Sequence, residues 1–557
     1  MAHHRPMGAG VTASGKHTRF RYTLAGAWVA LVFGCLAFTP SLLPRGALIQ
    51  GAICGVNAAI GYGFGVLGAW VWRAFADREE RPARRASWLV FAVVAPLVAI
   101  ASYVLGRYWQ TQQRDLLGMD SEAVGQQLLI PLVAALLFVA LVALGRALNH
   151  LYHWLARLLR RWIGPKAASA VGWVAVAGGT YFVVSGLLLG TLADLANQGF
   201  SVRNDITQEG VVQTTSSVRS GGPGSLVTWR SLGREGRTFI GRGPTADDIG
   251  SFTGEPALEP VRAFAGLESA ADTEERAALA VADLERAGGF DRKYLMVATT
   301  TGSGWVSPGG ADSFEYITGG DSAIVAIQYS YLPSWISYLV DQAKAREAGR
   351  ALFDAVYEEW IQLPEDGRPE LVVFGESLGT FGGEAAFSGE QDLANRTSGA
   401  LLTGPPNFNV LHQEFTSNRD AGSLEISPIY RNGRIVRFDN QTDGTIEPVG
   451  APWDGTRVLY VQHPSDPIVW WSPDLILHEP DWLDEPAGFD VLDQMFWMPV
   501  VTFWQISADL PTATAVPAGH GHLYTPTYVD AWATILQPDG WSADKQEQLE
   551  QIVAAGS

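Results

Sequence analysis

The stretch LVVFGESLGTFGG, residues 371–383, joins an apolar run to a G-x-S-x-G motif. Its apolar residues lead straight into the pentapeptide GESLG (375–379), which has Ser377 at its centre. This pattern is typical of a strand that turns sharply into a helix and holds a serine on the turn. Small neighbours are needed because the turn brings strand and helix close together. With 61 glycines in the chain, the motif needs support from its surroundings.

Short apolar runs alternate with helical patterns on both sides of this motif. We predict strands at 260–267, 293–304 (running into a glycine-rich loop), 322–330, 370–375, 398–404 and 457–463. We predict helices at 273–289 and 335–363. Alternating strands and helices favour a mostly parallel sheet with helices on both faces. Residues 256–557 are therefore predicted to form an α/β domain, with Ser377 at the end of one of its strands.

A nucleophilic serine needs a base, and the base needs an acid that orients it. In a sheet of this kind the three residues follow the chain order serine, acid, histidine. Asp466 lies three residues past the strand RVLYVQH (457–463), where the orienting acid is expected. An aspartate in this place also suits a turn or a helix cap before Pro467. We predict that Asp466 is the acid and keep the capping role as the alternative.

The segment GHGH (519–522) supplies two histidines, only one of which can be the base. We favour His522 because it lies nearer the start of the following helix, and His520 stays the alternative. A metal site built from both is disfavoured, because no cysteine and no spaced acidic partner accompanies them. His463 is expected to be a structural loop histidine. The sequence indicates no metal and no cofactor.

Backbone N–H groups are expected to stabilise the negative charge that forms at such a serine. One predicted donor is Leu378, the residue after the serine. The second is predicted in the loop TTTGSGW, at Thr301 and Gly302, where glycine lets a donor approach the substrate. The same glycines also suit an ordinary turn. No G-K-[ST] follows them, so a phosphate-binding loop is not indicated.

The two parts of the chain differ in charge. Residues 1–192 hold 17 Lys and Arg against 6 Asp and Glu, whereas the remainder holds 22 against 51. The first part is basic and apolar and the second is acidic, which suggests that they face different environments. The acidic part would repel phosphates, so nucleic acid is not an expected partner. Both cysteines, Cys35 and Cys54, lie in the first part, so the second has no disulfide framework.

Five apolar stretches in the first part are each about long enough to cross a bilayer as a helix. They are residues 22–39, 47–72, 87–106, 128–145 and 168–190, and none has a charged residue in its interior. We predict a helical transmembrane domain of about five spans over residues 1–192, with a buried soluble bundle as the alternative. A transporter is disfavoured because no charged residue lies in the middle of a span. Glycines in the second stretch indicate close helix packing.

Basic residues cluster in the N-terminal segment, in the loop after the second stretch and in the loop after the fourth. These segments hold 14 of the 17 basic residues of this part. The positive-inside rule places the N-terminus in the cytoplasm and, after five spans, everything beyond about residue 192 on the outer side. Residues 146–163 suit either an amphipathic helix in the membrane interface or an extension of the fourth span. Residues 193–255, polar and glycine-rich, are expected to be an irregular linker.

The chain resembles a family of actinobacterial membrane α/β-hydrolases in three motifs that follow the five apolar stretches. These motifs are GESLG (375–379), HPSDPIV (463–469) and GHGHLY (519–524). That family pairs a multi-span N-terminal domain with a C-terminal serine-hydrolase domain, and the resemblance covers most of the chain. It implies an α/β-hydrolase fold and a catalytic triad that falls on Ser377, Asp466 and His522. The doubled GHGH leaves the histidine ambiguous, and the resemblance supplies no substrate.

Together these observations predict a membrane-anchored serine hydrolase of the esterase, lipase or thioesterase kind. Its expected place beside the outer leaflet makes the lipid bilayer a partner and an amphiphilic, lipid-linked ester a sensible substrate. An envelope acyltransferase would use the same triad, with a sugar or protein hydroxyl in place of water. A non-catalytic membrane scaffold with a hydrolase-like fold is the third possibility. The residues between 404 and 457 are expected to form a cap over the serine.

Overall fold

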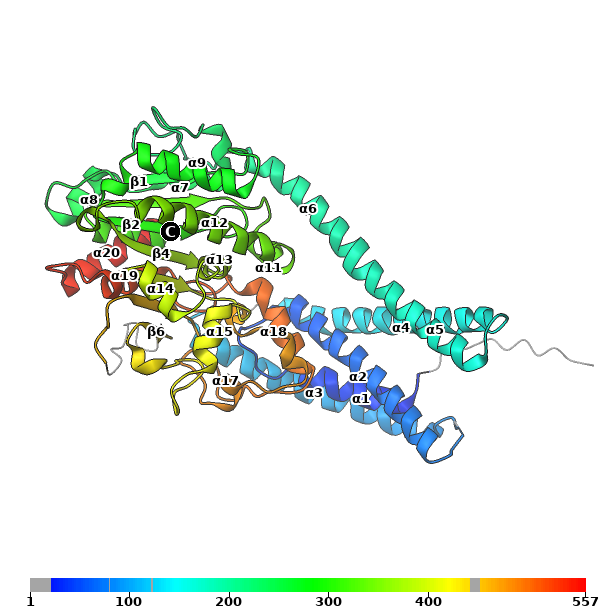
Figure 1. Ribbon diagram of the computed structural model, residues 1–557. Coiled ribbons are helices and arrows are strands. Elements are labelled where there is room, and N and C mark those ends of the chain that lie inside the picture. The colour runs from blue at the N-terminus through cyan, green and yellow to red at the C-terminus, as the bar shows by residue number, and fades with distance from the viewer. Residues whose placement is uncertain (1–21, 80, 122–123, 441–450, 557) are drawn as a thin grey trace, which may run out of the picture.

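The computed structural model describes residues 22–79, 81–121, 124–440 and 451–556. A helical bundle forms the first part of the chain and an α/β domain forms the second (Figure 1). Helix α6 (Leu189–Asn204) runs from the bundle to the edge of the α/β domain, where the Asn204 carbonyl accepts a hydrogen bond from Arg237 of α7 (Gly233–Arg242). The basic N-terminal segment lies outside the described residues.

Four helices of the bundle are long and apolar enough to cross a membrane, namely α2, α3, α4 and α5 with their extensions. The bundle consists of α1 (Leu24–Leu36), α2 (Ala47–Phe75), α3 (Arg85–Leu116), a 3-10 turn (Val124–Leu128), α4 (Leu129–Leu159), α5 (Pro165–Tyr181) and a π-helical stretch (Phe182–Leu188). Because α4 runs without a break to Leu159, residues 146–159 extend the fourth helix and form no separate in-plane helix.

The first apolar stretch forms a shorter helix than we expected. Helix α1 has 13 residues and is therefore about 20 Å long, less than the roughly 30 Å of a hydrocarbon core. The Thr39 hydroxyl donates to the Leu36 carbonyl (2.8 Å) at its end, and Pro40 cannot continue a helical ladder. Of the five apolar stretches, four thus form helices with the length and composition of a span among the described residues, and the first forms a shorter apolar helix.

Helix α2 packs closely against two neighbours through its glycines. A Cβ atom at Gly55 would lie 2.8 Å from the Ala134 carbonyl oxygen of α4. One at Gly61 would lie 2.7 Å from the Val29 carbonyl oxygen of α1. Small residues thus let the three backbones approach, which confirms the packing predicted for the second stretch.

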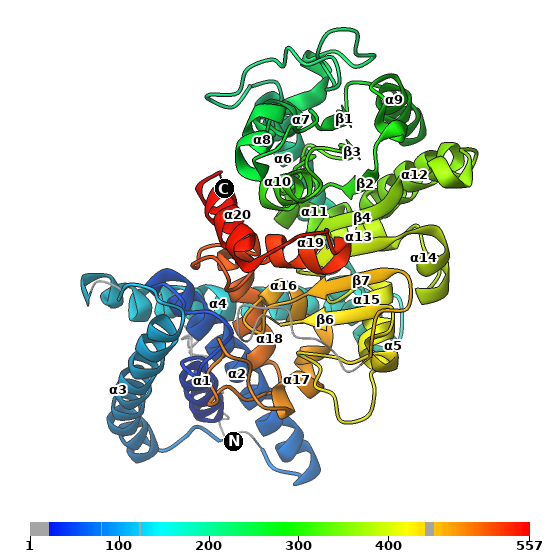
Figure 2. The same ribbon diagram turned by 90° about the vertical axis from the view of Figure 1, so that its left-hand side faces the viewer.

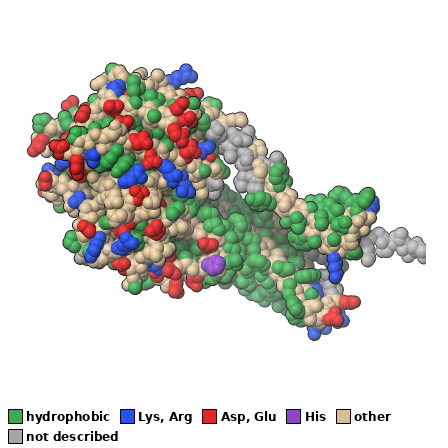
Figure 3. All heavy atoms as spheres, viewed as in Figure 1, with side chains coloured by type: hydrophobic (Ala, Val, Ile, Leu, Met, Phe, Trp, Pro, Cys, Tyr) green, Lys and Arg blue, Asp and Glu red, His purple; other side chains and the backbone are tan. Residues whose placement is uncertain are grey.

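Apolar side chains gather on the surface of the bundle, whereas charged side chains cover the α/β domain (Figure 3). Trp70 on α2, Leu97 on α3 and Leu136 on α4 are each at least 60% exposed. Extended apolar patches of this kind are rare on proteins that face water and mark contact with a membrane or a partner. The surface of the bundle therefore fits a lipid environment.

The α/β domain is built on a seven-stranded sheet with the order β1-β3-β2-β4-β5-β7-β6, in which every neighbouring pair is parallel. The strands are β1 (Val261–Ala265), β2 (Tyr294–Thr299), β3 (Ser322–Ile327), β4 (Glu370–Glu376), β5 (Gly399–Thr403), β6 (Val436–Asp439) and β7 (Arg457–Val461). Six of them confirm the predicted strands. Strand β6 escapes the sequence pattern because it has only four residues, two of them charged.

Helices cover both faces of the sheet (Figure 2). Helices α9 (Thr273–Arg286) and α12 (Gln342–Trp360) pack on one face, and α10 (Pro308–Ile317), α19 (Tyr528–Leu536) and α20 (Ala543–Gly556) pack on the other. The strands between them are almost wholly buried, as expected for a parallel sheet covered twice. The predicted α/β class of this domain is confirmed.

Two predictions about helices need correction. Residues 193–255 are not an irregular linker, because α7 and α8 (Ala246–Thr253) lie there and contribute Phe239, Ile240 and Ile249 to the core of the α/β domain. The predicted helix 335–363 is divided into α11 (Ser334–Val340) and α12. The division falls at Asp341, which leaves the helical backbone conformation and accepts a hydrogen bond from the Ser330 hydroxyl (2.7 Å).

The carboxyl ends of the strands face the helical bundle (Figure 1). The segments that follow β4, β5 and β7 contain α13 (Leu378–Glu384), α14 (Glu390–Arg396), α15 (Val410–Ser417), α16 (Pro467–Trp470), α17 (Asp481–Asp484) and α18 (Val501–Asp509). Of these, α18 packs directly against α2. Part of the expected cap, residues 441–450, lies outside the described residues. Because Ser377 directly follows β4, it lies at the edge of the sheet that is turned toward the bundle.

Candidate active site

Ser377 lies on a sharp turn between β4 and α13. Its φ angle is 56°, a left-handed conformation that costs free energy in a residue other than glycine. Two glycines make the turn possible, since a Cβ at Gly375 would lie 2.5 Å from the Gly379 backbone and one at Gly379 would lie 2.4 Å from the Thr299 carbonyl oxygen. The Ser377 N–H donates to the Thr403 carbonyl (2.9 Å). The strand–turn–helix arrangement expected from GESLG is present.

Asp466 and His522 form a buried pair at the same edge of the sheet. The His522 Nδ1 atom lies 2.6 Å from Asp466 Oδ2, although the two residues are 56 positions apart. The Tyr524 hydroxyl donates to the same carboxylate oxygen (2.7 Å), and the Ile468 N–H donates to the other one (2.8 Å). Asp466 thus orients the histidine and also caps α16, so both roles that the sequence allowed are present in the geometry.

The charges of this pair support each other. Burial disfavours the ionised form of Asp466, but the His522 charge and the hydrogen bonds from His522 and Tyr524 outweigh burial, so the pKa of Asp466 is lowered. Burial likewise opposes protonation of His522, but the Asp466 carboxylate outweighs it, so the pKa of His522 is raised above its ordinary 6.5. An aspartate that stays ionised beside an imidazole favours the imidazolium that general-base catalysis creates.

The free nitrogen of His522 is turned away from Asp466. Nε2 is buried and has no hydrogen-bond partner among the described residues. The imidazole lies against Gly404, where a Cβ would be 2.6 Å from its Cε1 atom, and Gly404 follows the Thr403 carbonyl that holds Ser377. The ring is therefore next to the serine turn with an unused proton acceptor. Catalytic hydrogen bonds commonly tighten only when substrate is bound.

His520 pairs with a different acid. Its Nδ1 atom lies 3.1 Å from Asp490 Oδ2, which also accepts a hydrogen bond from the Ser465 hydroxyl (2.5 Å). The Gly521 N–H donates to the Ser465 oxygen (2.8 Å). This network ties the loop that carries His522 to the loop that carries Asp466. The two histidines thus differ in their acid partners: His520 contacts Asp490 and His522 contacts Asp466.

Three residues that support this arrangement were not singled out from the sequence. Asp490 lies in a loop without a strand or helix pattern, and nothing in its neighbourhood signals it. Ser465 and Tyr524 each lie within two residues of a predicted site residue, and that proximity is the only signal they offer. Tyr524 contacts Asp466 through its hydroxyl and also stacks on His463, with ring centroids 4.2 Å apart.

The predicted oxyanion donors differ in their availability. Leu378 begins α13, and N–H groups in the first turn of a helix have no acceptor within the helix. The Thr301 N–H donates to the Trp305 carbonyl (3.1 Å), so it is not free in this structure. The neighbouring Gly302 lies against α11, where a Cβ would be 2.1 Å from the Ser337 hydroxyl oxygen. Of the predicted donors, the Thr301 N–H is thus already bound to Trp305, whereas Leu378 begins a helix.

His463 is buried, and its Nδ1–H donates to the Gly521 carbonyl (2.8 Å), in line with the structural role expected for it. Burial lowers its pKa. No group of three metal-ligating side chains occurs among the residues that the structure describes.

Comparison with known proteins agrees with the fold of this domain. The sequence model of the α/β-hydrolase family matches residues 261–549, which is more than half of the chain. The chain belongs to the α/β-hydrolase family. A second model, the N-terminus of an α/β-hydrolase family, matches residues 38–244 and thus covers most of the bundle, α6 and α7. No curated protein and no solved structure matches the chain.

In this hydrolase domain, a second carboxyl group lies directly before Ser377 in the chain. Glu376 is buried and accepts a hydrogen bond from the Tyr528 hydroxyl, which in turn accepts one from the Ser307 hydroxyl (3.1 Å). Burial raises the pKa of Glu376. Glu376 occupies the first variable position of the G-x-S-x-G motif. Because the motif allows any residue there, the sequence offered no reason to select it as a site residue.

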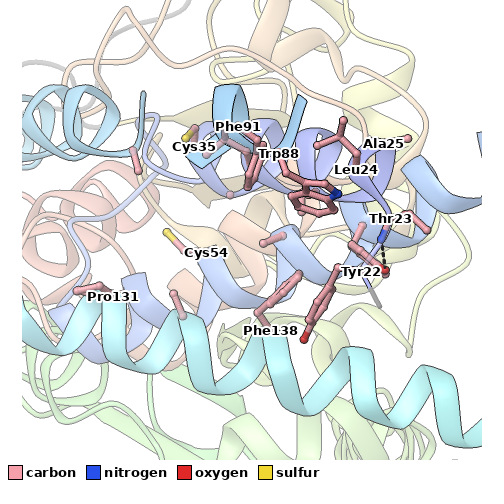
Figure 4. Close-up of a pocket in the computed structure, with 18 of the residues that line it drawn as sticks. Tyr22, Thr23, Leu24, Ala25, Cys35, Cys54, Trp88, Phe91, Pro131 and Phe138 are labelled. Atoms are coloured by element: carbon pink, nitrogen blue, oxygen red, sulfur yellow. Dashed lines mark hydrogen bonds between the residues drawn. The ribbon is translucent and has the colours of Figure 1, made fainter. Parts of the chain in front are cut away.

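A cavity of about 1610 Å³ lies within the helical bundle and not at Ser377 (Figure 4). Side chains from α1, α2, α3 and α4 line it, among them Cys35, Cys54, Phe91 and Phe138. Its walls are largely apolar. None of the predicted site residues is among the described residues that line it, so the cavity and the serine turn are separate features of the molecule.

Proposed function

We propose that this protein is a membrane-anchored serine hydrolase that cleaves an amphiphilic carboxylic ester or thioester through Ser377, His522 and Asp466. One observation carries the proposal: a buried Asp466–His522 pair with a free Nε2 atom lies beside a serine held on a strained turn. Such strain is characteristic of functional sites, where the surrounding structure maintains it. Membership of the α/β-hydrolase family supports the same reading.

In the proposed reaction, Ser377 Oγ attacks the carbonyl carbon of the ester while His522 Nε2 takes the hydroxyl proton. The N–H groups of Leu378 and Gly302 stabilise the oxyanion that forms. The imidazolium then gives its proton to the leaving alcohol or thiol, and an acyl-enzyme remains. A water molecule attacks this ester with His522 again as the base, which releases the carboxylic acid and restores Ser377. Asp466 stays ionised and stabilises the imidazolium in both steps.

The proposed location is the outer face of a membrane. The loop between α1 and α2 and the loop after α3 lie on the side of the hydrolase domain, where Leu42 and Leu117 join its apolar cluster. The loops at the opposite end of the bundle hold Arg73, Arg78, Arg81, Arg84 and Arg85, and then Arg157, Arg160, Arg161 and Lys166. The positive-inside rule assigns that opposite end to the cytoplasm. The hydrolase domain would then lie outside whether or not the short α1 crosses completely.

Aromatic side chains near the carboxyl edge of the sheet support an apolar acyl group as substrate. The ring of Tyr338 on α11 lies 4.9 Å from the ring of Phe408 and 6.2 Å from that of Trp471. The ring of Phe408 contacts Phe381 of α13, the helix that follows Ser377 (4.9 Å). Aromatic surface of this kind favours hydrocarbon over charged groups. We therefore propose a lipid-linked ester and not a small charged one.

The test is covalent labelling of the full-length protein in native membranes or nanodiscs with an alkyl fluorophosphonate. We expect one probe molecule per chain, and mass spectrometry of the digested protein should locate it on the peptide that contains Ser377. A native protein that stays folded but resists both short and long alkyl probes would favour the scaffold alternative. Attachment at another serine would overturn the assignment of Ser377.

The labelling rate should depend on pH through His522. The base acts only in its neutral form, and its pKa is raised in the folded protein. The second-order rate constant should therefore rise with pH through a midpoint above 6.5. In the Asp466→Asn variant the midpoint should fall, because the charge that favours the imidazolium is gone. Labelling between about pH 5 and about pH 9 measures both midpoints; equal midpoints in the two proteins would refute the pairing.

A further inference from the structure

The loop between the first two helices, residues 37–46, enters the hydrolase domain and is held there by α18. The Asp509 carboxylate accepts hydrogen bonds from the Ser41 hydroxyl and from the N–H groups of Leu42 (3.2 Å) and Leu43 (3.4 Å). The Arg45 guanidinium lies 3.3 Å from the other oxygen of Asp509, and both side chains are fully buried. One carboxylate of the hydrolase domain thus binds four groups of the bundle.

Further contacts fix the same loop from both sides. Gln505, one turn before Asp509 on α18, donates to the carbonyl and to the hydroxyl of Thr39 (both 3.0 Å). From within the bundle, Gln110 of α3 accepts from the Arg45 N–H (2.8 Å), and Gln50 of α2 donates to the Ala37 carbonyl (2.9 Å). A buried ion pair is tolerated only when its other hydrogen-bonding groups are satisfied as well. The two terminal nitrogens of Arg45 donate to the Ala37 (3.4 Å) and Thr39 (3.3 Å) carbonyls. Arg45 Nε and Asp509 Oδ1 face each other as an ion pair without a hydrogen bond. The loop is thus bound both to the bundle and to α18.

The loop also supplies apolar side chains to a cluster behind the proposed active site. Leu42 and Leu43 are buried together with Val469 and Trp470 of α16, Ile506 of α18 and Val516. Asp466 caps helix α16, and Trp470 Nε1 donates to the His463 carbonyl (3.1 Å). The loop therefore packs against the element that carries the acid.

The same cluster also lies beside the chain segment that holds the proposed base, His522. Helix α18 ends at Asp509, and four residues later the Ala513 carbonyl accepts the His522 N–H (2.8 Å). Ala513 also lies against Gly521, where a Cβ would be 2.6 Å from its carbonyl oxygen. Because the acid and the base reach the site from chain segments 56 positions apart, their 2.6 Å contact depends on what holds these two segments in place.

We propose that the bundle positions the Asp466–His522 pair through the 37–46 loop, so that Leu43 and Asp509 are positioning residues for the reaction and the bundle is more than an anchor. This inference rests on the proposed function. Displacement of a catalytic group by about 1 Å is enough to cost about 100-fold in rate. A loosened cluster should therefore slow the chemistry of a protein that still folds.

The experiment uses full-length Leu43→Ala and Asp509→Asn variants in nanodiscs, labelled with the alkyl fluorophosphonate. We expect each to label to the same final stoichiometry as the native protein, with a rate constant lower by at least about tenfold. The pH midpoint of labelling should fall as the contact between acid and base loosens. Leu43→Met keeps the apolar volume and should label at a nearly native rate. Val142→Ala, a buried change between α2 and α4 away from this loop, is the matched control and should leave the rate unchanged.

Each result has a distinct meaning. Slower labelling with a lower pH midpoint in Leu43→Ala, restored in Leu43→Met, supports positioning. A reduced stoichiometry with the native rate constant and native midpoint would mean that the loop only stabilises the fold, and the inference would be wrong. If the native protein labels at Ser377 and all variants match it, the inference fails while the proposed function stands. If the native protein does not label at all, the proposed function fails, and this inference fails with it.

Discussion

Replacement of Ser377 by alanine should abolish fluorophosphonate labelling and lower ester hydrolysis on the order of 10⁵-fold or more. The reason is that no other hydroxyl replaces the one held on the strained turn at φ 56°. Alanine removes one oxygen atom and leaves the contacts of the turn, including the hydrogen bond from the residue 377 N–H to the Thr403 carbonyl, in place. Labelling intensity and initial rates on a medium-chain p-nitrophenyl ester measure the effect.

The control for this variant is Ser398→Ala. Ser398 lies directly before β5, at the amino edge of the sheet and thus opposite to the proposed site. It should label and hydrolyse the ester as the native protein does. Retention of more than about a hundredth of the native rate in Ser377→Ala would show that the observed hydrolysis comes from another group, because nucleophile removal costs far more than that in serine hydrolases.

Replacement of His522 by alanine should cost on the order of 10⁵-fold, whereas His520→Ala should cost no more than about tenfold. His522 is the histidine on Asp466, with Nε2 unoccupied, and its loss removes the base. His520 contacts Asp490, so its loss only weakens the network between the two loops. The two variants are well matched because the residues differ by two positions in the same GHGH segment.

The pair of variants is measured by the rate constant of labelling at a pH well above the His522 midpoint, where the base is neutral. Both proteins must first show native thermal unfolding, since His522 is buried and its removal leaves a gap. The reverse order of effects, with His520→Ala inactive and His522→Ala active, would transfer the role of base to His520. It would also require a different arrangement of Asp466 and Asp490 from the one described here.

Local features of this protein were readable from the sequence because neighbouring residues alone produce them. The turn at 371–383 follows from an apolar strand, small residues and a serine within one short segment, and sterics leave such a segment few alternatives. Six of the seven strands and the four long apolar helices are equally local, since runs of uninterrupted apolar residues mark them. The parallel class of the sheet then follows from the alternation of strands and helices.

Features that depend on segments far apart in the chain were decided only by the tertiary structure. The sequence favoured His522 but left His520 as an alternative, because both lie in one glycine-rich segment and only the folded chain brings a particular acid to each. The sequence also offered no sign of Asp490 or strand β6, whose surroundings have no periodic pattern. It suggested an irregular linker where α7 and α8 contribute to the core of the α/β domain.

The contact between the bundle and the proposed active site is the clearest case. Ser41 and Asp509 are 468 positions apart, and no pattern within either segment predicts that they meet. Arg45 follows the first apolar stretch in a short loop, and nothing in that loop predicts that its side chain is fully buried against Asp509. The sequence determined which segments form helices, strands and the serine turn, since propensity and periodicity act over a few residues. Tertiary packing decides which of these segments contact and hold one another, because packing depends on the whole folded chain.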